Sequence, residues 1–325
     1  MGNATANGST GHPLIRGWRR LSHSGSLGIL GGLAILVIVF GLASPFFFTV
    51  SNLLNIAKQS SINAVIAFGM TMVIISGGID LSVGSVVALA AVVMATLMKA
   101  AVPVPAAILA GLVIGFLSGA LNGIFISRVQ LAPFIVTLGS MSYLRGLALV
   151  FTKGMPIYGV AASVRWFGNG SVWIIPAPVL LAGGMALISL FLLRRTRFGE
   201  YTIAMGGNEE ATRLSGVNTV RYKTLVYAFS GLCSVVGAII LMARINAAEP
   251  IAGTGFELDA IAAAVMGGTS LSGGVGSIVG TVVGALIITG LRNGLNLLNV
   301  DANWQQVAIG VVIMLAVIID RIRKR

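Results

Sequence analysis

Two aspartates stand where proton or ion chemistry would need a carboxylate. Asp80 lies between two apolar runs, in the sequence Ser-Gly-Gly-Ile-Asp-Leu-Ser-Val-Gly, and Asp259 lies at the start of another apolar run. Carboxylates inside membrane spans carry protons or ions in transporters, whereas an aspartate at the start of a helix caps its free amides. Both interpretations stay open for both residues, and capping is the one that we favour.

The chain lacks the motifs of the common enzyme sites. It contains no Gly-x-x-x-x-Gly-Lys-Ser/Thr sequence for ATP, no Gly-x-Ser-x-Gly nucleophile turn and no His-Glu-x-x-His zinc site. The single cysteine, Cys233, lies in an apolar run, and the two histidines, His12 and His23, lie near the N-terminus. We therefore predict no catalytic residue, no metal site and no cofactor site in this chain, and we predict that it is not an enzyme.

Composition indicates the kind of element that must position these residues. Hydrophobic residues make up 56% of the 325 residues and charged residues only 9%, and the mean hydropathy is +0.97. Because roughly 20 apolar residues span the hydrocarbon core of a bilayer, the many apolar runs predict an all-α, polytopic membrane protein without a soluble domain. The net charge of +12 does not indicate nucleic-acid binding, since the basic residues lie at the ends of apolar runs.

Ten apolar runs are predicted to cross the membrane. They cover residues 27–43, 62–76, 83–98, 104–125, 133–151, 173–193, 222–243, 258–271, 274–291 and 305–320. The first run has the alternative of being a signal peptide, but its length favours a span. The runs at 83–98 and 258–271 are the weakest candidates for complete crossings. Residues 1–26 are predicted to form a disordered cytoplasmic tail, and residues 27–325 the transmembrane domain.

The basic residues predict the orientation of the chain. With the N-terminus inside, fourteen Lys and Arg residues lie on the cytoplasmic side and six on the other, with Arg145 inside a span. An excess of positive charge marks the cytoplasmic side of a membrane protein. The even number of spans then places both termini in the cytoplasm, and it places Trp166, Trp173 and Trp304 near the opposite membrane surface.

Charges cluster between spans at residues 206–216, in the predicted cytoplasmic loop between the sixth and seventh spans. Asn208 is an N-cap of a short helix, the acids that follow lie at the positive end of its dipole, and Gly216 can adopt the left-handed conformation that ends it. Glu209 and Arg213, four residues apart, are predicted to form an ion pair. So short a helix is not stable alone. We interpret it as a cytoplasmic docking element, and the alternative is a solvated helix that links two spans.

Glycines recur every four residues in two of the spans and predict close contacts between helices. They are Gly111, Gly115, Gly119 and Gly123, and then Gly276, Gly280 and Gly284. Packing around a transport pathway and ordinary bundle packing explain this pattern equally well. The sequence of residues 118–123 is echoed at 289–294, in spans that run in opposite directions. The echo predicts an inverted repeat that relates spans two to five to spans seven to ten.

Residues 77–84, Gly-Gly-Ile-Asp-Leu-Ser-Val-Gly, resemble a hallmark of the permease subunits of bacterial ABC sugar importers, in the ribose, xylose and galactoside branch. The motif residues are Gly77, Gly78, Asp80, Ser82 and Gly84. The resemblance continues through residues 131–139, 206–216 and 264–274, and it covers nearly the whole chain after the N-terminal tail. It implies the ABC importer permease fold, a homodimer of permease chains and the import of a ribose-type monosaccharide.

The resemblance also implies partners. A partner ABC ATPase would bind ATP and Mg, and a periplasmic sugar-binding protein would deliver the cargo, at the inner membrane of a bacterium. Residues 210–216 resemble the loop by which importer permeases engage their ATPase, although Thr212 replaces an alanine of that pattern and the Ile-x-Leu-Pro that often follows is absent. The coupling residues that this implies are Asn208, Glu209, Glu210, Arg213 and Gly216.

Polar groups within the spans are the candidates for contact with a sugar. They are Asn63, Thr71, Asn122, Thr137 and Ser140, with Phe134 as an aromatic face. Hydrogen bonds between neighbouring helices are the alternative role for each of them. Two other functions stay open: a permease for branched-chain amino acids or nucleosides, and an ion-driven secondary transporter. The latter predicts transport without an ATPase and its loss in Asp80→Asn or Asp259→Asn.

Overall fold

The computed structural model describes residues 26–323, so the predicted tail at residues 1–26 lies outside the described part apart from Ser26. Helices dominate, as predicted. In chain order they are α2 (Ser26–Ala43), α3 (Val50–Ile75), α4 (Val83–Lys99), α5 (Val104–Ser127), α6 (Pro133–Thr152), α7 (Ala162–Asn169), α8 (Ala177–Arg195), α9 (Arg197–Gly207), α10 (Glu209–Leu214), α11 (Thr219–Ile245), α12 (Phe256–Met266), α13 (Ile278–Leu297) and α14 (Ala302–Arg323). Strand β1 (Ile157–Tyr158) pairs antiparallel with β4 (Ala247–Ala248), and β2 (Ser171–Val172) pairs with β3 (Ile175–Pro176).

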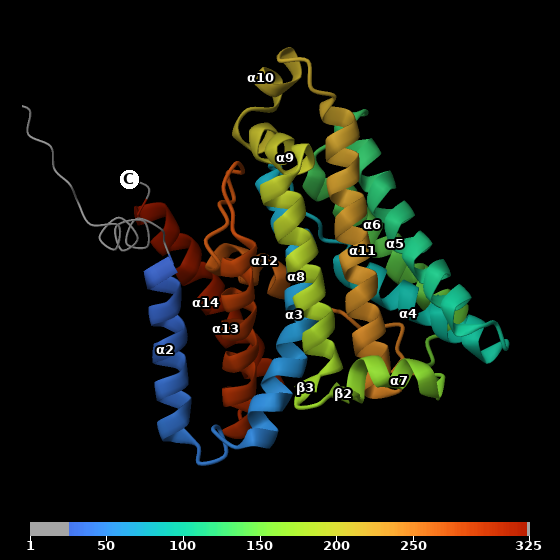
Figure 1. The fold of residues 1–325 in the computed structure, drawn as a ribbon, viewed down its shortest axis with the longest axis vertical. Coiled ribbons are helices and arrows are strands. Elements are labelled where there is room, and N and C mark those ends of the chain that lie inside the picture. Colours follow the sequence, from blue (N-terminus) through green and yellow to red (C-terminus); the bar gives the residue numbers. More distant parts are fainter. Residues whose placement is uncertain (1–25, 324–325) are drawn as a thin grey trace, which may run out of the picture.

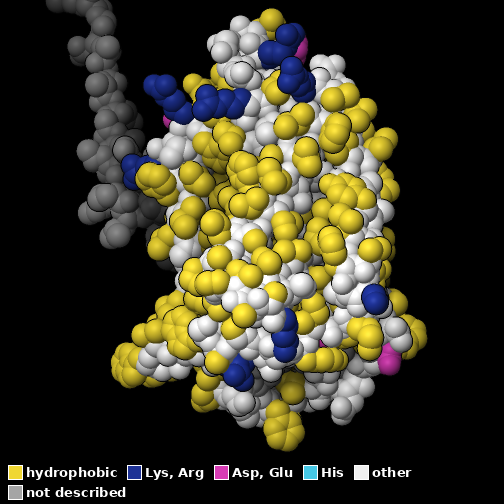
Figure 2. Space-filling view, turned by 90° about the vertical axis from the view of Figure 1, so that its right-hand side faces the viewer, with side chains coloured by type: hydrophobic (Ala, Val, Ile, Leu, Met, Phe, Trp, Pro, Cys, Tyr) yellow, Lys and Arg dark blue, Asp and Glu magenta, His cyan; other side chains and the backbone are white. Residues whose placement is uncertain are grey.

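The long helices run side by side and form a bundle with two distinct ends (Figure 1). Helices α9 and α10 lie at one end, and α7 lies with β2 and β3 at the other; we refer to these as the α10 end and the α7 end. Helix α2 begins and α14 ends on the side of the α10 end. Among residues 26–323, six helices are long and apolar enough to cross a membrane: α3, α5, α6, α8, α11 and α13. Figure 2 shows a broad band of hydrophobic side chains between basic side chains at the two ends.

Helices α3 and α11 form the centre of the bundle. Of their most apolar stretches, 89% and 72% of the residues are buried, against 22–28% for α5, α6 and α8. Helix α3 packs on α8, α11, α12 and α13, and α11 packs on α4, α5 and α7. The outer helices turn large apolar side chains such as Phe116, Ile135 and Leu187 outward. Lipid tails are as apolar as these side chains, so the outer surface suits a multi-pass membrane protein.

Each of the ten predicted spans overlaps a helix, but α3 is much longer than its apolar run. The more polar residues 50–61, which precede the apolar run, also belong to this helix. It begins at Val50 because the Thr49 side chain caps it there, accepting a hydrogen bond from the Asn52 amide at 3.4 Å. Helices α7 and α9 were not expected from the sequence. They are only 8 and 11 residues long and contain polar residues, so they carry no apolar run of spanning length.

The predicted span at 258–271 is wrong as a helical crossing. Helix α12 has 11 residues, or about 16 Å of helix, against a hydrocarbon core of about 30 Å. It stops because Gly267 packs directly on α13, where a Cβ atom would lie 2.5 Å from the Gly280 carbonyl carbon, and because Gly268 has a φ of 88°. The non-helical residues 246–255 make up the rest of the passage from α11 to α12.

Helix bounds and packing partners support the predicted inverted repeat. Gly119 and Gly290 of the echo are 171 residues apart, and a shift by this number brings α3, α4, α5 and α6 onto α11, α12, α13 and α14. The contacts follow the same relation, because α5 packs on α11 as α13 packs on α3, and α4 packs on α5 as α12 packs on α13. Helix α3 runs toward the α10 end and α11 runs away from it (Figure 1), so the two halves have opposite directions.

The predicted glycine stripes lie where helices meet backbone to backbone. A Cβ atom on Gly119 of α5 would lie 2.1 Å from the Tyr227 oxygen of α11, and one on Gly284 of α13 would lie 2.1 Å from the Ala263 oxygen of α12. Such approaches exclude any side chain. Gly111 and Gly276 are exceptions: Gly111 faces the Met94 side chain of α4, and Gly276 precedes α13 and faces a side chain at the end of α3. The second stripe is therefore shorter than predicted.

Candidate functional site

The short helix predicted within residues 206–216 is present and forms the tip of the α10 end (Figure 1). It is α10, a helix of 6 residues. The Asn208 side-chain oxygen accepts a hydrogen bond from the Ala211 amide at 2.9 Å, which confirms the predicted N-cap. Gly216 has a φ of 86°, so the predicted left-handed end of the helix is confirmed as well.

The ion pair predicted between Glu209 and Arg213 is wrong. Arg213 instead binds Glu210 through Nη2–Oε1 at 2.6 Å and Nε–Oε2 at 3.0 Å, with the two side chains 61% and 64% exposed. The Arg213 hydrogen bond lowers the pKa of Glu210, but solvent around the pair limits what it adds to stability. Glu209 turns the other way and binds the Nζ of Lys223, a buried lysine on α11. Glu209 takes this partner because α11 brings Lys223 against the inner side of α10.

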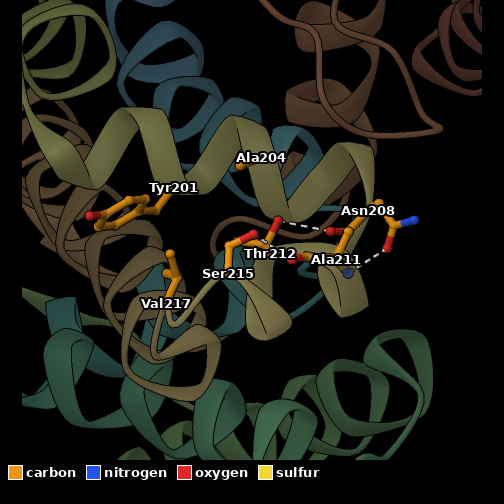
Figure 3. Close-up of a pocket in the computed structure, with 7 residues that line it drawn as sticks. All are labelled: Tyr201, Ala204, Asn208, Ala211, Thr212, Ser215 and Val217. Carbon is orange, nitrogen blue, oxygen red and sulfur yellow. Dashed lines mark hydrogen bonds between the residues drawn. The ribbon is translucent and has the colours of Figure 1, made fainter.

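A groove of about 370 Å³ separates α9 from α10 (Figure 3). The residues that line it are Tyr201, Ala204, Asn208, Ala211, Thr212, Ser215 and Val217. The Tyr201 ring also packs edge to face against Tyr222 of α11, with the ring centres 4.8 Å apart, and this contact fixes α9 to α11. The Thr212 hydroxyl donates a hydrogen bond to the backbone carbonyl oxygen of Asn208 at 2.8 Å. The groove is thus a mostly apolar surface on rigidly mounted helices.

Helix α9 is joined to two distant segments through Gly206. A Cβ atom at this position would lie 1.7 Å from the Ile75 oxygen, at the end of α3, and 2.4 Å from the Gly274 nitrogen, in the segment before α13. These two groups bind each other, because the Gly274 amide donates to the Ile75 oxygen at 2.9 Å. Only backbone atoms meet here, so no flexible side chain absorbs a displacement. A displacement of α9 toward the bundle would therefore press on the end of α3 and on the segment before α13.

The family motif forms the turn between α3 and α4, inside the bundle. Asp80 is 1% exposed. Its Oδ1 accepts from the Ser82 amide at 3.0 Å and the Ser82 hydroxyl at 2.6 Å, and its Oδ2 accepts from the Ser230 hydroxyl at 2.9 Å. The Asn122 amide donates to the Ser82 hydroxyl oxygen at 3.0 Å, and the Ser140 hydroxyl donates to Asn122. One carboxylate thus connects this turn to α5, α6 and α11 through a fully bonded polar network.

The glycines of the motif permit close approaches around the same turn. Gly77 has a φ of 80°, which favours glycine. A Cβ atom on Gly78 would lie 2.2 Å from the Tyr227 hydroxyl oxygen, and one on Gly84 would lie 2.1 Å from the Gly253 oxygen. The motif therefore needs small residues for packing as well as the polar network of Asp80.

The capping role predicted for the two aspartates is confirmed only in part. Asp80 bonds the Ser82 amide at the start of α4, but Ser82 itself is the N-cap residue. Asp259 is not a cap: Gly255 precedes α12, and Asp259 lies in the first turn and binds Arg292 of α13 through Oδ1–Nη2 at 3.1 Å. Within residues 26–323, no three His, Cys, Asp or Glu side chains gather as metal ligands would.

The residues predicted to contact a sugar do not form one cluster. Asn63 of α3 donates to the Thr289 hydroxyl oxygen at 3.1 Å, and Thr71 shares a hydrogen bond with Thr281 at 2.7 Å, both across the contact of α3 with α13. The polar candidates of α5 and α6 surround the turn before α4 instead. Phe134 is 55% exposed on α6. Hydrogen bonds within and between helices occupy the polar groups, and their contact with a sugar stays a prediction.

Three residues with central contacts were not among the predicted site residues. Lys223 and Gly206 meet partners that are distant in the sequence. Gly206 lies in the predicted docking element at residues 206–216, but no local pattern indicated its contact or that of Lys223. Arg145 of α6 donates from Nη1 to the Pro250 oxygen at 2.9 Å and to the Ala252 oxygen at 2.5 Å. For this residue a signal existed, because an arginine inside an apolar run rarely faces lipid and commonly marks a functional site.

Residues 52–317 match a family model described as the permease component of branched-chain amino acid transport systems. The chain is 46% identical to the ribose import permease proteins of Escherichia coli (strain K12) and Bacillus subtilis (strain 168), over 89% and 93% of this chain and 91% and 96% of theirs. It is 42% identical to the D-allose transport system permease protein of Escherichia coli (strain K12), over 89% of this chain and 90% of that one. No solved structure matches it. The chain therefore belongs to the ABC importer permease family described as the permease component of branched-chain amino acid transport systems.

Proposed function

We propose that this chain is the transmembrane permease of an ABC importer that takes up a ribose-type monosaccharide. The observation that carries the proposal is the identity of 42–46% with permeases for ribose and D-allose, over about nine tenths of both chains. The family description names branched-chain amino acids instead. Transport of such amino acids is therefore the second candidate, and an experiment has to separate the two.

In this proposal the α10 end faces the cytoplasm, with both termini on the same side, and α10 with its groove docks on an ABC ATPase. Its capped ends and the contact between Glu209 and Lys223 support α10 as a rigid docking element. The partner ATPase holds ATP and Mg, and this chain supplies no catalytic residue. Asn208, Glu210, Arg213 and Gly216 shape the docking element rather than take part in a reaction.

Closure of the ATPase on ATP would push α10 and α9 toward the bundle. The backbone contact of Gly206 with Ile75 and Gly274 would pass the movement to α3 and α13, and the pair of Glu209 with Lys223 would pass it to α11. Because α3 belongs to one repeat and α11 and α13 to the other, such a push can rock one repeat against the other. Two copies of the chain would form the transport unit, with a periplasmic sugar-binding protein at the α7 end.

The proposal is tested by reconstituting the permease in liposomes with the ATPase and the binding protein encoded by neighbouring genes. We expect ATP-dependent uptake of labelled ribose or a close relative, and no uptake with the nucleotide omitted. Uptake of leucine in place of sugars would support the second candidate. Sugar accumulation by the permease alone, driven by a proton or sodium gradient, would contradict the ABC mechanism.

The docking role of α10 has its own test. We expect Glu210→Lys and Gly216→Pro to leave the protein in the membrane while uncoupling ATP hydrolysis from uptake. Glu200→Lys reverses an exposed charge on α9 and serves as the matched control. Normal uptake by both α10 variants at normal expression contradicts the docking role.

A further inference from the structure

Between α11 and α12 the chain runs from Asn246 to Gly255 without helix. Gly253 in this segment touches Gly84 of α4: a Cβ atom on Gly84 would lie 2.1 Å from the Gly253 oxygen, and one on Gly253 would lie 2.6 Å from the Gly84 oxygen. Helix α4 ends at Lys99, toward β1 and the α7 end. Gly84 therefore lies about 22 Å along α4 from that end. Close to Gly84, Ser82 bonds Asp80, which accepts from Ser230 near the middle of the long helix α11, so Gly253 lies at the depth of the hydrocarbon core.

Two residues of the same segment, Ile251 and Thr254, are exposed on the surface of the single chain, while Pro250 and Gly253 are buried. Ile251 is 62% exposed and Leu258, in the first turn of α12, is 50% exposed. Thr254 lies between them and is exposed as well. Its hydroxyl donates to the Ile251 oxygen at 2.7 Å, while its amide has no hydrogen-bond partner among the described residues. Lipid tails offer no hydrogen bonds, and irregular backbone at membrane depth is tolerated only against protein or water.

Two charged side chains accompany the exposed backbone. Arg145 reaches from α6 and donates to two carbonyl oxygens of the segment, those of Pro250 and Ala252. Glu257 accepts from the Gly255 amide at 3.2 Å. Both charged side chains are partly exposed. Charged residues at membrane depth face the protein interior or a water-filled cavity rather than lipid, so they point to the same environment as the irregular backbone.

We propose that residues 249–255 line a water-filled pathway between two copies of this chain, and that Thr254 contacts the transported solute. Arg145 is a positioning residue that holds the segment in place through its two carbonyl groups. The free amide and the hydroxyl oxygen of Thr254 offer a donor and an acceptor for a sugar hydroxyl. This inference rests on the proposed function, because it needs the two-copy transport unit, but it can fail while that function stands.

Substituted-cysteine labelling tests the pathway directly. Cys233 is the only cysteine and is fully buried, so the unmodified chain measures the background labelling. Thr254→Cys is compared with Leu187→Cys, which is 70% exposed at the middle of the regular helix α8. In proteoliposomes of the complete transporter, a charged methanethiosulfonate should modify the first variant at least about tenfold faster, because only a hydrated thiol forms the reactive thiolate. A bifunctional thiol reagent should also join two copies through residue 254.

The role of Arg145 is tested in the Thr254→Cys background. Arg145→Ala should change the modification rate several-fold and reduce uptake, and Arg145→Lys should restore part of both, because lysine keeps a cationic donor. A purely structural role would lower the amount of folded protein without changing the modification rate of the protein that remains. That result would overturn the positioning role.

The outcomes separate the inference from the proposed function. Equal, slow modification of Thr254→Cys and Leu187→Cys, with ATP-driven sugar uptake intact in the unmodified transporter, overturns the pathway and leaves the function standing. If the Thr254 variant does not fold, Ile251→Cys takes its place and the same comparison applies. Fast modification without cross-linking of two copies overturns the location between copies.

Discussion

Replacing Gly206 with alanine adds one methyl group inside the contact that joins α9 to the rest of the bundle. The new Cβ atom would lie 1.7 Å from the Ile75 oxygen and 2.4 Å from the Gly274 nitrogen. Carbon and oxygen that are not bonded stay at least about 3 Å apart, so α9 must retreat by roughly 1.3 Å or the hydrogen bond between these two backbone groups must break. Overpacking of this kind costs about 1–3 kcal/mol, and the lost hydrogen bond about 1 kcal/mol more.

Gly207 provides the matched control, because a Cβ atom there meets nothing within 4 Å. Both glycines lie in the last turn of α9. Gly207→Ala should stabilise the helix by about 0.4–1 kcal/mol, since alanine loses less conformational entropy on folding. The two substitutions therefore have opposite expected signs at adjacent positions.

The assay has two readouts on the reconstituted transporter: the midpoint of thermal unfolding and the sugar uptake per ATP hydrolysed. We expect Gly206→Ala to lower the midpoint and to reduce uptake more than ATP hydrolysis, because α9 no longer seats against α3 and the segment before α13. Gly207→Ala should match or exceed the unmodified protein in both readouts. Equal behaviour of the two variants would refute the reasoning that Gly206 carries the movement of α9 into the bundle.

Three further predictions concern the contacts of α10 and the packing of α5 against α11. The Arg213 hydrogen bond lowers the pKa of Glu210 below its usual 4.5. The ion pair is therefore intact above pH 4.5 and is lost only as the pH falls through the lowered pKa. Glu210→Gln should consequently leave the shape of the plot of sugar uptake against pH unchanged between about pH 6 and 8. Lys223→Met removes the buried partner of α10 and should lower the coupling ratio, measured as sugar imported per ATP, without loss of membrane insertion. Gly119→Ala should lower thermal stability by about 1–3 kcal/mol because its methyl group would enter the α5–α11 contact, whereas Gly146→Ala, at a position with open space, should not.

Local features of α10 could be predicted from the sequence because both partners of each contact are close along the chain. The Asn208 cap and the left-handed Gly216 are examples. The predicted partner of Arg213 was wrong because two neighbouring acids, Glu209 and Glu210, can both reach it. Which of them binds Arg213 depends on Lys223, a residue of α11. Once Lys223 of α11 takes Glu209, Arg213 binds Glu210.

The spans show the same limit. Apolar runs located ten of the helices in the described part of the chain, because burial in lipid requires apolar side chains whatever the packing. Run length did not predict that α12 would stop after 11 residues, since Gly267 and Gly268 end it through their contact with α13 and their backbone conformation. The segment 249–255 and its partner Arg145 were not recognised as one feature, because Arg145 and Pro250 are 105 residues apart.

The sequence by itself determined the membrane character, the approximate positions of the long apolar helices, the motif at residues 77–84 and the caps of α10. All of these follow from side-chain type and short-range spacing. Only the tertiary structure decided which distant groups meet: the backbone of Gly206 with that of Ile75, the backbone of Gly84 with that of Gly253, and the side chain of Asp80 with that of Ser230. These contacts join residues far apart in the chain, and their geometry depends on how whole helices cross, which no local pattern of residues specifies.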